Sequence, residues 1–182
     1  MKKEKTTVIF TGGGSAGHVT PNFPLMQALQ ARGIQVHYLG SETGIERGLV
    51  TAQQIPYYPI STGKLRRYWS WQNFLMPFQL FKGIAQSAYY CYRQKPQVIF
   101  SKGGFVALPV VIGAWLNRIP VVVHESDLSP GLANRLSFPF AKKINNKKYV
   151  SLGYRFDLFF IKGIVNEVLI SVVLRRKNRY YW

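Results

Sequence analysis

Cysteine is nearly absent from this chain of 182 residues. Its single cysteine, Cys91, excludes a disulfide within the chain, and with it the class of small disulfide-stapled scaffolds. We interpret Cys91 as a small buried side chain on a helix. Because cysteine and histidine residues also form no cluster, the sequence predicts no metal site, and no cofactor is expected.

Long apolar runs are missing as well. No segment reaches the roughly 18 uninterrupted apolar residues of a membrane-spanning helix. The best candidate, residues 158–174, is interrupted by Lys162, Asn166 and Glu167. The apolar run in the opening MKKEKTTVIF is too short for the core of a secretory signal. We therefore expect a protein that is soluble or peripheral to a membrane.

Acidic residues are also scarce. The chain has 7 Asp and Glu against 24 Lys and Arg, which gives a formal net charge of +17. Such an excess favours an anionic partner, which could be nucleic acid, a phosphorylated metabolite or an acidic lipid surface. Hydrophobic residues make up 47% of the chain, which is enough for a packed core and excludes a disordered protein.

Strand-like and helix-like segments alternate over the first 144 residues. Short β-branched or aromatic runs predict strands at residues 7–10, 35–39, 57–60, 97–100 and 121–124. Helices are predicted at residues 25–31, 74–93 with a break near Pro77, and 109–117, with Gly33 ending the first. This alternation predicts an α/β fold, a Rossmann-like doubly wound parallel sheet with helices on both faces.

The segments that follow the five predicted strands share one composition. They are rich in Gly, Ser, Thr and charged residues, and they read TGGGSAGH, GSETG, STGKLRR, SKGGF and ESDLSPGLAN. Ligands of such folds bind beyond the carboxyl ends of the strands. We therefore expect a polar ligand at this edge, although loops in general favour the same residue types.

The first of these segments contains a G-x-G-x-x-G pattern at Gly12, Gly14 and Gly17. Glycines after a strand let the backbone turn sharply and bring N–H groups against a pyrophosphate. A nicotinamide site also needs an acidic residue about 20 residues further on, and Glu42 comes late for that role. A dinucleotide-binding oxidoreductase is therefore the weaker alternative. His18, at the end of the segment, could donate to phosphate, act as a neutral general base or fill the turn.

Two further segments allow more than one interpretation. Residues 63–83, GKLRRYWSWQNFLMPFQLFKG, combine basic and aromatic side chains, which suits a membrane interface, nucleic-acid stacking or the inner face of a helix. Glu125 and Asp127 follow the fifth predicted strand. They could orient a sugar hydroxyl or a base, or cap the next helix.

Several of these segments, in order, resemble one known family. TGGGSAGHVTPN, GSETGIE, ISTGKLRRY and FSKGGFVALPVVIGAWLNRIPVVVHESDLSPGLANR are together similar to the N-terminal half of the MurG family. These peptidoglycan glycosyltransferases move N-acetylglucosamine from UDP-N-acetylglucosamine to undecaprenyl-linked muramoyl-pentapeptide, lipid I, and so form lipid II. The resemblance implies that residues 1–144 are the acceptor-binding half of a two-domain GT-B glycosyltransferase, without its C-terminal donor domain.

The resemblance also assigns roles to single residues. His18 matches the histidine proposed as general base for the acceptor hydroxyl. Ser15-Ala16 replaces the usual Thr-Gly, and Asp127 stands where many members have Asn. The substrate-binding residues implied in this way are Gly13, Gly14, Ser15, Ala16, Gly17, Lys102, Gly103, Gly104, Glu125, Asp127 and Asn134.

The family binds membranes through a hydrophobic patch with a basic rim, which favours lipid over nucleic acid as the anionic partner here. We expect attachment to the anionic inner-membrane surface, on its cytoplasmic face. The matching residues are Lys64, Arg66, Arg67, Trp69, Trp71, Phe74, Leu75, Phe78 and Trp115.

Residues 145–182 differ from the rest of the chain. They contain 8 basic and 2 acidic residues and show no alternation of strands and helices. We interpret them as an atypical basic tail, frameshifted or truncated, and expect the chain alone to be inactive in transfer. The alternative is a non-catalytic remnant that binds the membrane or the lipid acceptor.

Overall fold

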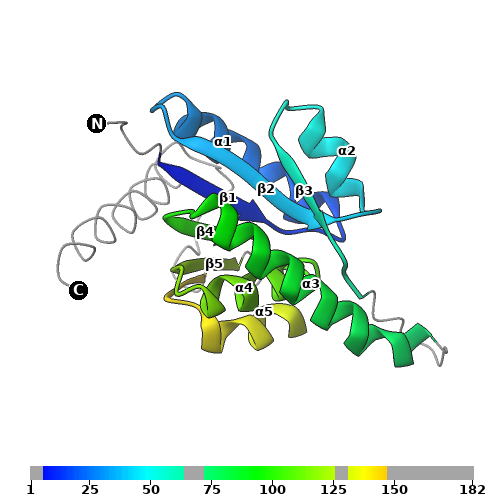
Figure 1. Ribbon diagram of the computed structural model, residues 1–182. Coiled ribbons are helices and arrows are strands. Elements are labelled where there is room, and N and C mark those ends of the chain that lie inside the picture. The colour runs from blue at the N-terminus through cyan, green and yellow to red at the C-terminus, as the bar shows by residue number, and fades with distance from the viewer. Residues whose placement is uncertain (1–5, 64–71, 126–130, 147–182) are drawn as a thin grey trace.

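A computed structural model describes residues 6–63, 72–125 and 131–146 (Figure 1). Its strands form one sheet in the order β3-β2-β1-β4-β5-β6, and every neighbouring pair is parallel. The strands are β1 (Thr7–Thr11), β2 (Gln35–Ser41), β3 (Tyr57–Ile60), β4 (Val98–Ser101), β5 (Val121–Glu125) and β6 (Lys143–Asn146). The predicted α/β fold with a Rossmann-like parallel sheet is confirmed.

Five helices cover the two faces of this sheet, with α1 and α2 on one side and α3, α4 and α5 on the other (Figure 1). Short 3-10 turns occupy residues 16–18, 20–22 and 138–140. The helices are α1 (Phe23–Gln30), α2 (Ile45–Thr51), α3 (Gln72–Gln94), α4 (Ala107–Leu116) and α5 (Leu132–Ser137). Helix α2 and strand β6 are absent from the sequence-based expectations, which also give no bounds for α5. Strand β6 crosses the predicted boundary after residue 144, and residues 147–182 lie outside the described part.

Strands β1, β4 and β5, in the middle of the sheet, are buried on both faces, which explains their almost unbroken apolar sequences. In β1, Val8 and Phe10 belong to the core beneath α1 and α2, and Ile9 belongs to the core beneath α3 and α4. Tyr38 of β2 and Phe100 of β4 join the first core. Successive side chains along a strand point to opposite faces of the sheet, so one sheet contributes side chains to two separate cores.

Helices α3 and α4 approach closely because small residues line their contact. A Cβ atom on Gly113 would lie 2.8 Å from the backbone nitrogen of Ala88, and the side-chain amide of Asn117 donates to the Ala88 carbonyl at 3.0 Å. Cys91 of α3 is buried in the same core, as expected. The break expected near Pro77 is wrong, because α3 is continuous from Gln72 to Gln94. Pro77 lies near the start of the helix, where its missing N–H removes one backbone hydrogen bond.

Two helices end in the same way with different residues. Gly33 follows α1 with φ +72°, and its N–H donates to the Gln30 carbonyl at 2.8 Å, so its predicted role as helix stop is confirmed. Arg118 follows α4 with φ +55°, and its N–H donates to the Trp115 carbonyl at 2.8 Å. Both residues occupy the left-handed position of a Schellman-type end, which glycine adopts at little cost and arginine does not.

Exchanging the residue types at these two ends should move stability in opposite directions. Gly33→Ala should lower the free energy of unfolding by about 0.5 to 1 kcal/mol, and Arg118→Gly should raise it by a similar amount. Urea denaturation of the two variants and the parent measures both changes. A loss of stability in Arg118→Gly would contradict the assigned role of its backbone conformation.

Candidate functional site

The order of the strands reverses between β1 and β4, because the chain proceeds from β1 to one side of the sheet and from β4 to the other. In doubly wound sheets this point opens the crevice in which ligands bind. The loops that leave β1 and β4 are the first glycine loop (residues 12–18) and the second glycine loop (residues 102–106). The fold therefore brings the two predicted glycine-rich segments to its topological switch point.

The two glycine loops are in direct contact. The backbone N–H of Lys102 donates to the carbonyl of Thr11 at 2.9 Å, which continues the pairing of β1 with β4. Gly104 has φ +83°, and a Cβ atom there would collide with the carbonyl oxygen of Gly13. Only a residue without a side chain fits this position.

The outer part of the first glycine loop is open to solvent. Residues 14–17 are exposed, and a Cβ atom on Gly14 would meet no atom within 4 Å. Among the described residues, the backbone N–H groups of Ser15, Ala16 and Gly17 have no acceptor. Consecutive N–H groups in such a turn form a concave anion site.

His18 is held by the same loop. Its Nδ1 lies 2.8 Å from the hydroxyl of Ser15, and the side chain is half-buried. The side-chain amide of Asn22 donates to the His18 backbone carbonyl at 3.2 Å. If Nδ1 carries the proton and donates to Ser15, then Nε2 is an unprotonated acceptor, the form that a general base requires.

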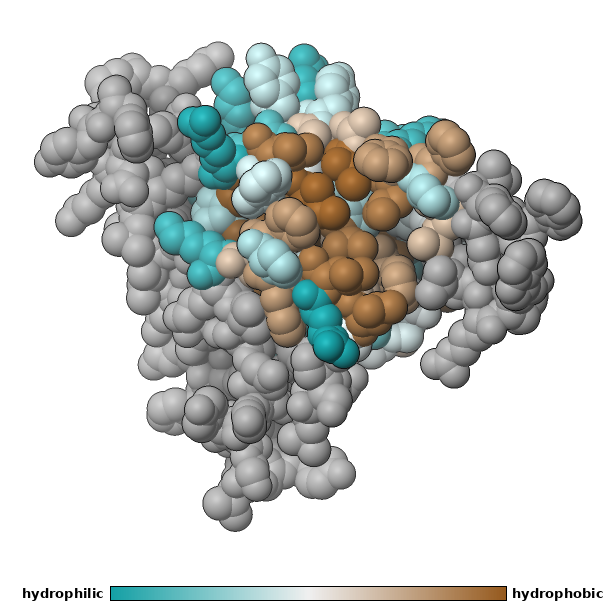
Figure 2. Space-filling view, turned by 90° about the horizontal axis from the view of Figure 1, so that it is seen from below, coloured by the Kyte–Doolittle hydropathy of each residue, from teal (hydrophilic) through white to brown (hydrophobic). Residues whose placement is uncertain are grey.

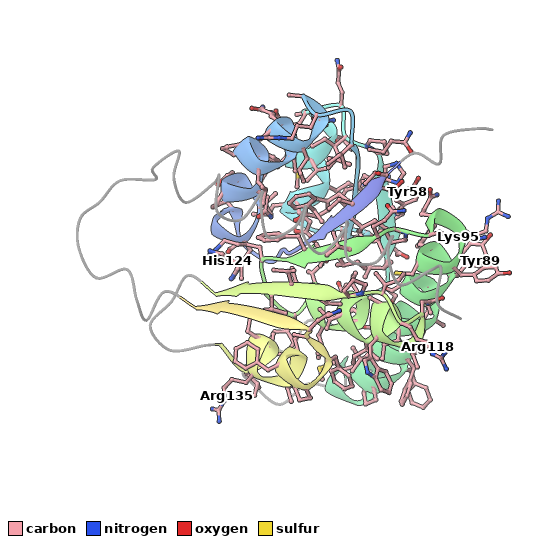
Figure 3. All side chains as sticks on the ribbon, turned by 90° about the vertical axis from the view of Figure 1, so that its left-hand side faces the viewer. Tyr58, Tyr89, Lys95, Arg118, His124 and Arg135 are labelled. Carbon is pink, nitrogen blue, oxygen red and sulfur yellow. The ribbon has the colours of Figure 1, made fainter. Side chains whose placement is uncertain are left out.

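A buried pair of side chains lies behind the second glycine loop. Lys102 and His124 are each 4% exposed, and the ammonium of Lys102 lies 3.0 Å from Nδ1 of His124. Because an ammonium only donates, His124 accepts at Nδ1 and is neutral. Figure 3 shows His124 at the carboxyl ends of the strands. His124 is not among the predicted site residues, but the fold makes it the partner of one of them, Lys102.

The side chain of Asn134, on α5, packs against Gly103 of the second glycine loop. A Cβ atom on Gly103, which has φ +92°, would lie 2.6 Å from the side-chain nitrogen of Asn134. Asn134 is 4% exposed. The predicted Glu125 is the last residue of β5, and the predicted Asp127 lies outside the described residues. In the described parts of the chain, no three His, Cys, Asp or Glu side chains could together hold a metal ion.

Two residues that the sequence analysis does not select support the first glycine loop from below. The hydroxyl of Tyr38 donates to the carbonyl of Gly12 at 2.8 Å, and the carboxylate of Glu46 accepts from the N–H of Gly14 at 3.4 Å. Burial, and then the negative charge of Glu46, raise the pKa of Tyr38, so its hydroxyl remains protonated and able to donate. The scarcity of acidic residues marks each of the 7 Asp and Glu as unusual, but it does not single out Glu46.

The predicted membrane patch is described only in part. Lys64, Arg66, Arg67, Trp69 and Trp71 lie outside the described residues, and Phe74 and Leu75 belong to the start of α3. Phe78 of α3 is 74% exposed and Trp115 of α4 is 52% exposed. Figure 2 shows apolar side chains gathered on the face that carries α3, α4 and α5. We call this face the apolar face, and its exposed residues are Phe78, Phe81, Trp115, Leu116, Leu132 and Leu136. No helix in the described residues is long and apolar enough to span a membrane.

Comparison with known proteins identifies this arrangement. Residues 8–145 match the N-terminal domain of glycosyltransferase family 28. The chain belongs to this family. The predicted resemblance to the family is therefore confirmed, and a dinucleotide-binding oxidoreductase is not supported.

Two curated relatives carry the same name. A Legionella pneumophila (strain Corby) protein is 59% identical over 138 residues, which cover 76% of this chain and 38% of the relative. A Clostridium novyi (strain NT) protein is 54% identical over 140 residues, covering 77% and 39%. Both are named UDP-N-acetylglucosamine--N-acetylmuramyl-(pentapeptide) pyrophosphoryl-undecaprenol N-acetylglucosamine transferase. The chain thus spans less than two fifths of the length of these curated relatives.

A solved structure of the family shows the same fold. MurG of Acinetobacter baumannii superposes with a TM-score of 0.66 at 30% sequence identity, and the match covers 78% of this chain and 40% of that one. The region matched by the family 28 domain extends from β1 to β6 and contains the described helices and strands between them.

The contact between the glycine loops can be tested by stability. Gly104→Ala and Gly14→Ala both place a methyl group at a left-handed backbone position, but only the first meets another atom. Gly104→Ala should therefore lower the free energy of unfolding by about 1 to 3 kcal/mol more than Gly14→Ala. Thermal denaturation compares the two, and equal losses would argue against the contact.

Proposed function

We propose that this chain is the acceptor-binding half of a glycosyltransferase of peptidoglycan synthesis. The transferred group is N-acetylglucosamine, the donor is UDP-N-acetylglucosamine and the acceptor is lipid I, as in the names of the relatives. The observation that carries the proposal is the meeting of two glycine loops at the switch point of a family 28 domain. Relatives have most of their length outside the matched region, so we expect no transfer by these 182 residues alone.

The first glycine loop suits the pyrophosphate of the acceptor. Its exposed N–H groups at Ser15, Ala16 and Gly17 can donate to phosphate oxygens without displacing any described contact. The ammonium of Lys102 stands behind the adjoining second loop and adds a positive charge to the same edge of the sheet. Glu125, Asp127 and Asn134 remain predicted sugar- or nucleotide-side contacts.

His18 is proposed as the general base of an inverting transfer. Nε2 takes the proton of the acceptor hydroxyl while that oxygen attacks the anomeric carbon of N-acetylglucosamine. The new carbon–oxygen bond forms as the bond from that carbon to the UDP oxygen breaks, and UDP leaves with the bonding electrons. The contact of Nδ1 with the Ser15 hydroxyl accommodates the tautomer in which Nδ1 donates and Nε2 carries no proton.

The apolar face is proposed to rest on the anionic surface of the inner membrane, on the cytoplasmic side, where a lipid-linked acceptor is presented. Exposed aromatic and leucine side chains from α3, α4 and α5 would enter the lipid headgroup region. Arg118, just after α4, and Arg135, within α5, are both exposed (Figure 3). Their positive charges would attract anionic lipid headgroups. Nucleic acid is not proposed as a partner.

Acceptor binding provides the direct test. A short-chain lipid I analogue with its pyrophosphate should bind the 182-residue chain about tenfold more tightly than the same analogue with a monophosphate. Lys102→Met should reduce this preference, whereas Arg32→Met, at an exposed position just after α1, should not. Calorimetric titration measures each affinity. Equal affinity for both analogues would overturn the assignment of the pyrophosphate site.

Flotation with vesicles tests the apolar face. Phe81→Asp should reduce binding to phosphatidylglycerol vesicles severalfold, because the charge would enter the lipid interface. Ile45→Asp changes a similarly exposed apolar residue on α2, across the sheet, and should leave flotation unchanged. Equal loss in both variants would indicate that the apolar face is not the attachment surface.

A further inference from the structure

Glu46 is a carboxylate enclosed by the protein. It is 0% exposed, in a chain that has 7 acidic residues in total. Two glycines make room for it: a Cβ atom on Gly13 would lie 2.7 Å from the carboxyl carbon, and one on Gly44 would collide with both carboxylate oxygens. Burying a carboxylate costs several kcal/mol unless hydrogen bonds replace its water, so an apolar side chain would occupy this space more cheaply.

The hydrogen bonds of Glu46 connect three segments. Its Oε1 accepts the backbone N–H of Ser41 at 3.1 Å and also the hydroxyl of Ser41, at the end of β2. Its Oε2 accepts the N–H of Gly14, in the first glycine loop, at 3.4 Å. All three donors are neutral groups. The carboxylate therefore anchors the glycine loop to β2 and to the start of α2.

The peptide unit that joins Gly13 to Gly14 is held at both ends. Its N–H points to Glu46, and its carbonyl oxygen lies against Gly104 of the second glycine loop. A peptide between two glycines flips easily because neither residue has a side chain. The flipped orientation would turn the carbonyl oxygen toward the carboxylate, where two negative oxygens repel.

We infer that Glu46 is a positioning residue that prevents this flip and so holds the first glycine loop in its anion-binding orientation. The inference rests on the proposed function of that loop. Glu46 does not touch the ligand. It acts through the Gly14 N–H, and Tyr38 assists by fixing the neighbouring carbonyl of Gly12.

Glu46→Gln tests the inference with little change in size. An amide oxygen in the place of Oε1 keeps both donors of Ser41, and the NH₂ group then faces the Gly14 N–H and breaks that bond. The amide proton resonance of Gly14 should move upfield, and affinity for the short-chain lipid I analogue should fall about tenfold.

Ser41→Ala is the matched control, because it removes the hydroxyl donor from the same carboxylate and keeps the contact with Gly14. It should lower stability without moving the Gly14 resonance. Gly44→Ala is the second variant, since its methyl group displaces the carboxylate from outside the loop. Gly44→Ala should also move the Gly14 amide proton resonance upfield and lower the affinity for the analogue. If Glu46→Gln does not fold, Gly44→Ala alone tests the positioning role.

The outcomes separate this inference from the proposed function. Unchanged Gly14 resonance and affinity in Glu46→Gln and Gly44→Ala overturn the positioning role while the parent chain still binds the analogue. Failure of the parent to bind the analogue overturns the proposed pyrophosphate site. The Gly14 resonance still tests the role of Glu46 in that case, because it needs no ligand.

Discussion

The site depends on one steric constraint, the contact of Gly104 with the carbonyl of Gly13. Parallel pairing of β1 and β4 brings the two glycine loops to the same edge of the sheet. The absence of a side chain at position 104 lets the second loop lie against the first. Asn134 lies beside Gly103 of the same loop, and Lys102, at the start of the loop, is buried.

Electrostatics at this edge are arranged in two layers. Exposed backbone N–H groups lie on the outer side of the first glycine loop and a buried ammonium lies behind the second, while a carboxylate lies beneath the first loop and faces neutral donors. A carboxylate close to an anion site opposes binding in proportion to its charge, so its presence requires a compensating benefit. Here the benefit is orientation, because a single carboxylate oxygen fixes the direction of one peptide in a flexible run of glycines.

Much of the fold could be predicted from the sequence because the signals are local. Five strands are β-branched or aromatic runs, and Gly33 ends α1 by its own backbone preference. Helix α2 is short and has no clear apolar stripe, and β6 is recognisable only by its pairing with β5. In the site, the glycine loops carry a motif, whereas Glu46 and His124 acquire their roles through burial and partners that only the folded chain brings together. Charge scarcity indicates that such an acid is unusual, but not where it lies.

The solitary thiol of Cys91 has a practical consequence. It lies on α3, 1% exposed, in the core between the sheet and the two helices α3 and α4. A water-soluble thiol reagent can reach it only when this layer opens, locally or with the whole domain, so labelling kinetics would report the opening of that layer. The apolar face lies on the same helices. The rate of Cys91 labelling would therefore also show whether contact with a lipid surface stabilises or destabilises the packing of these helices.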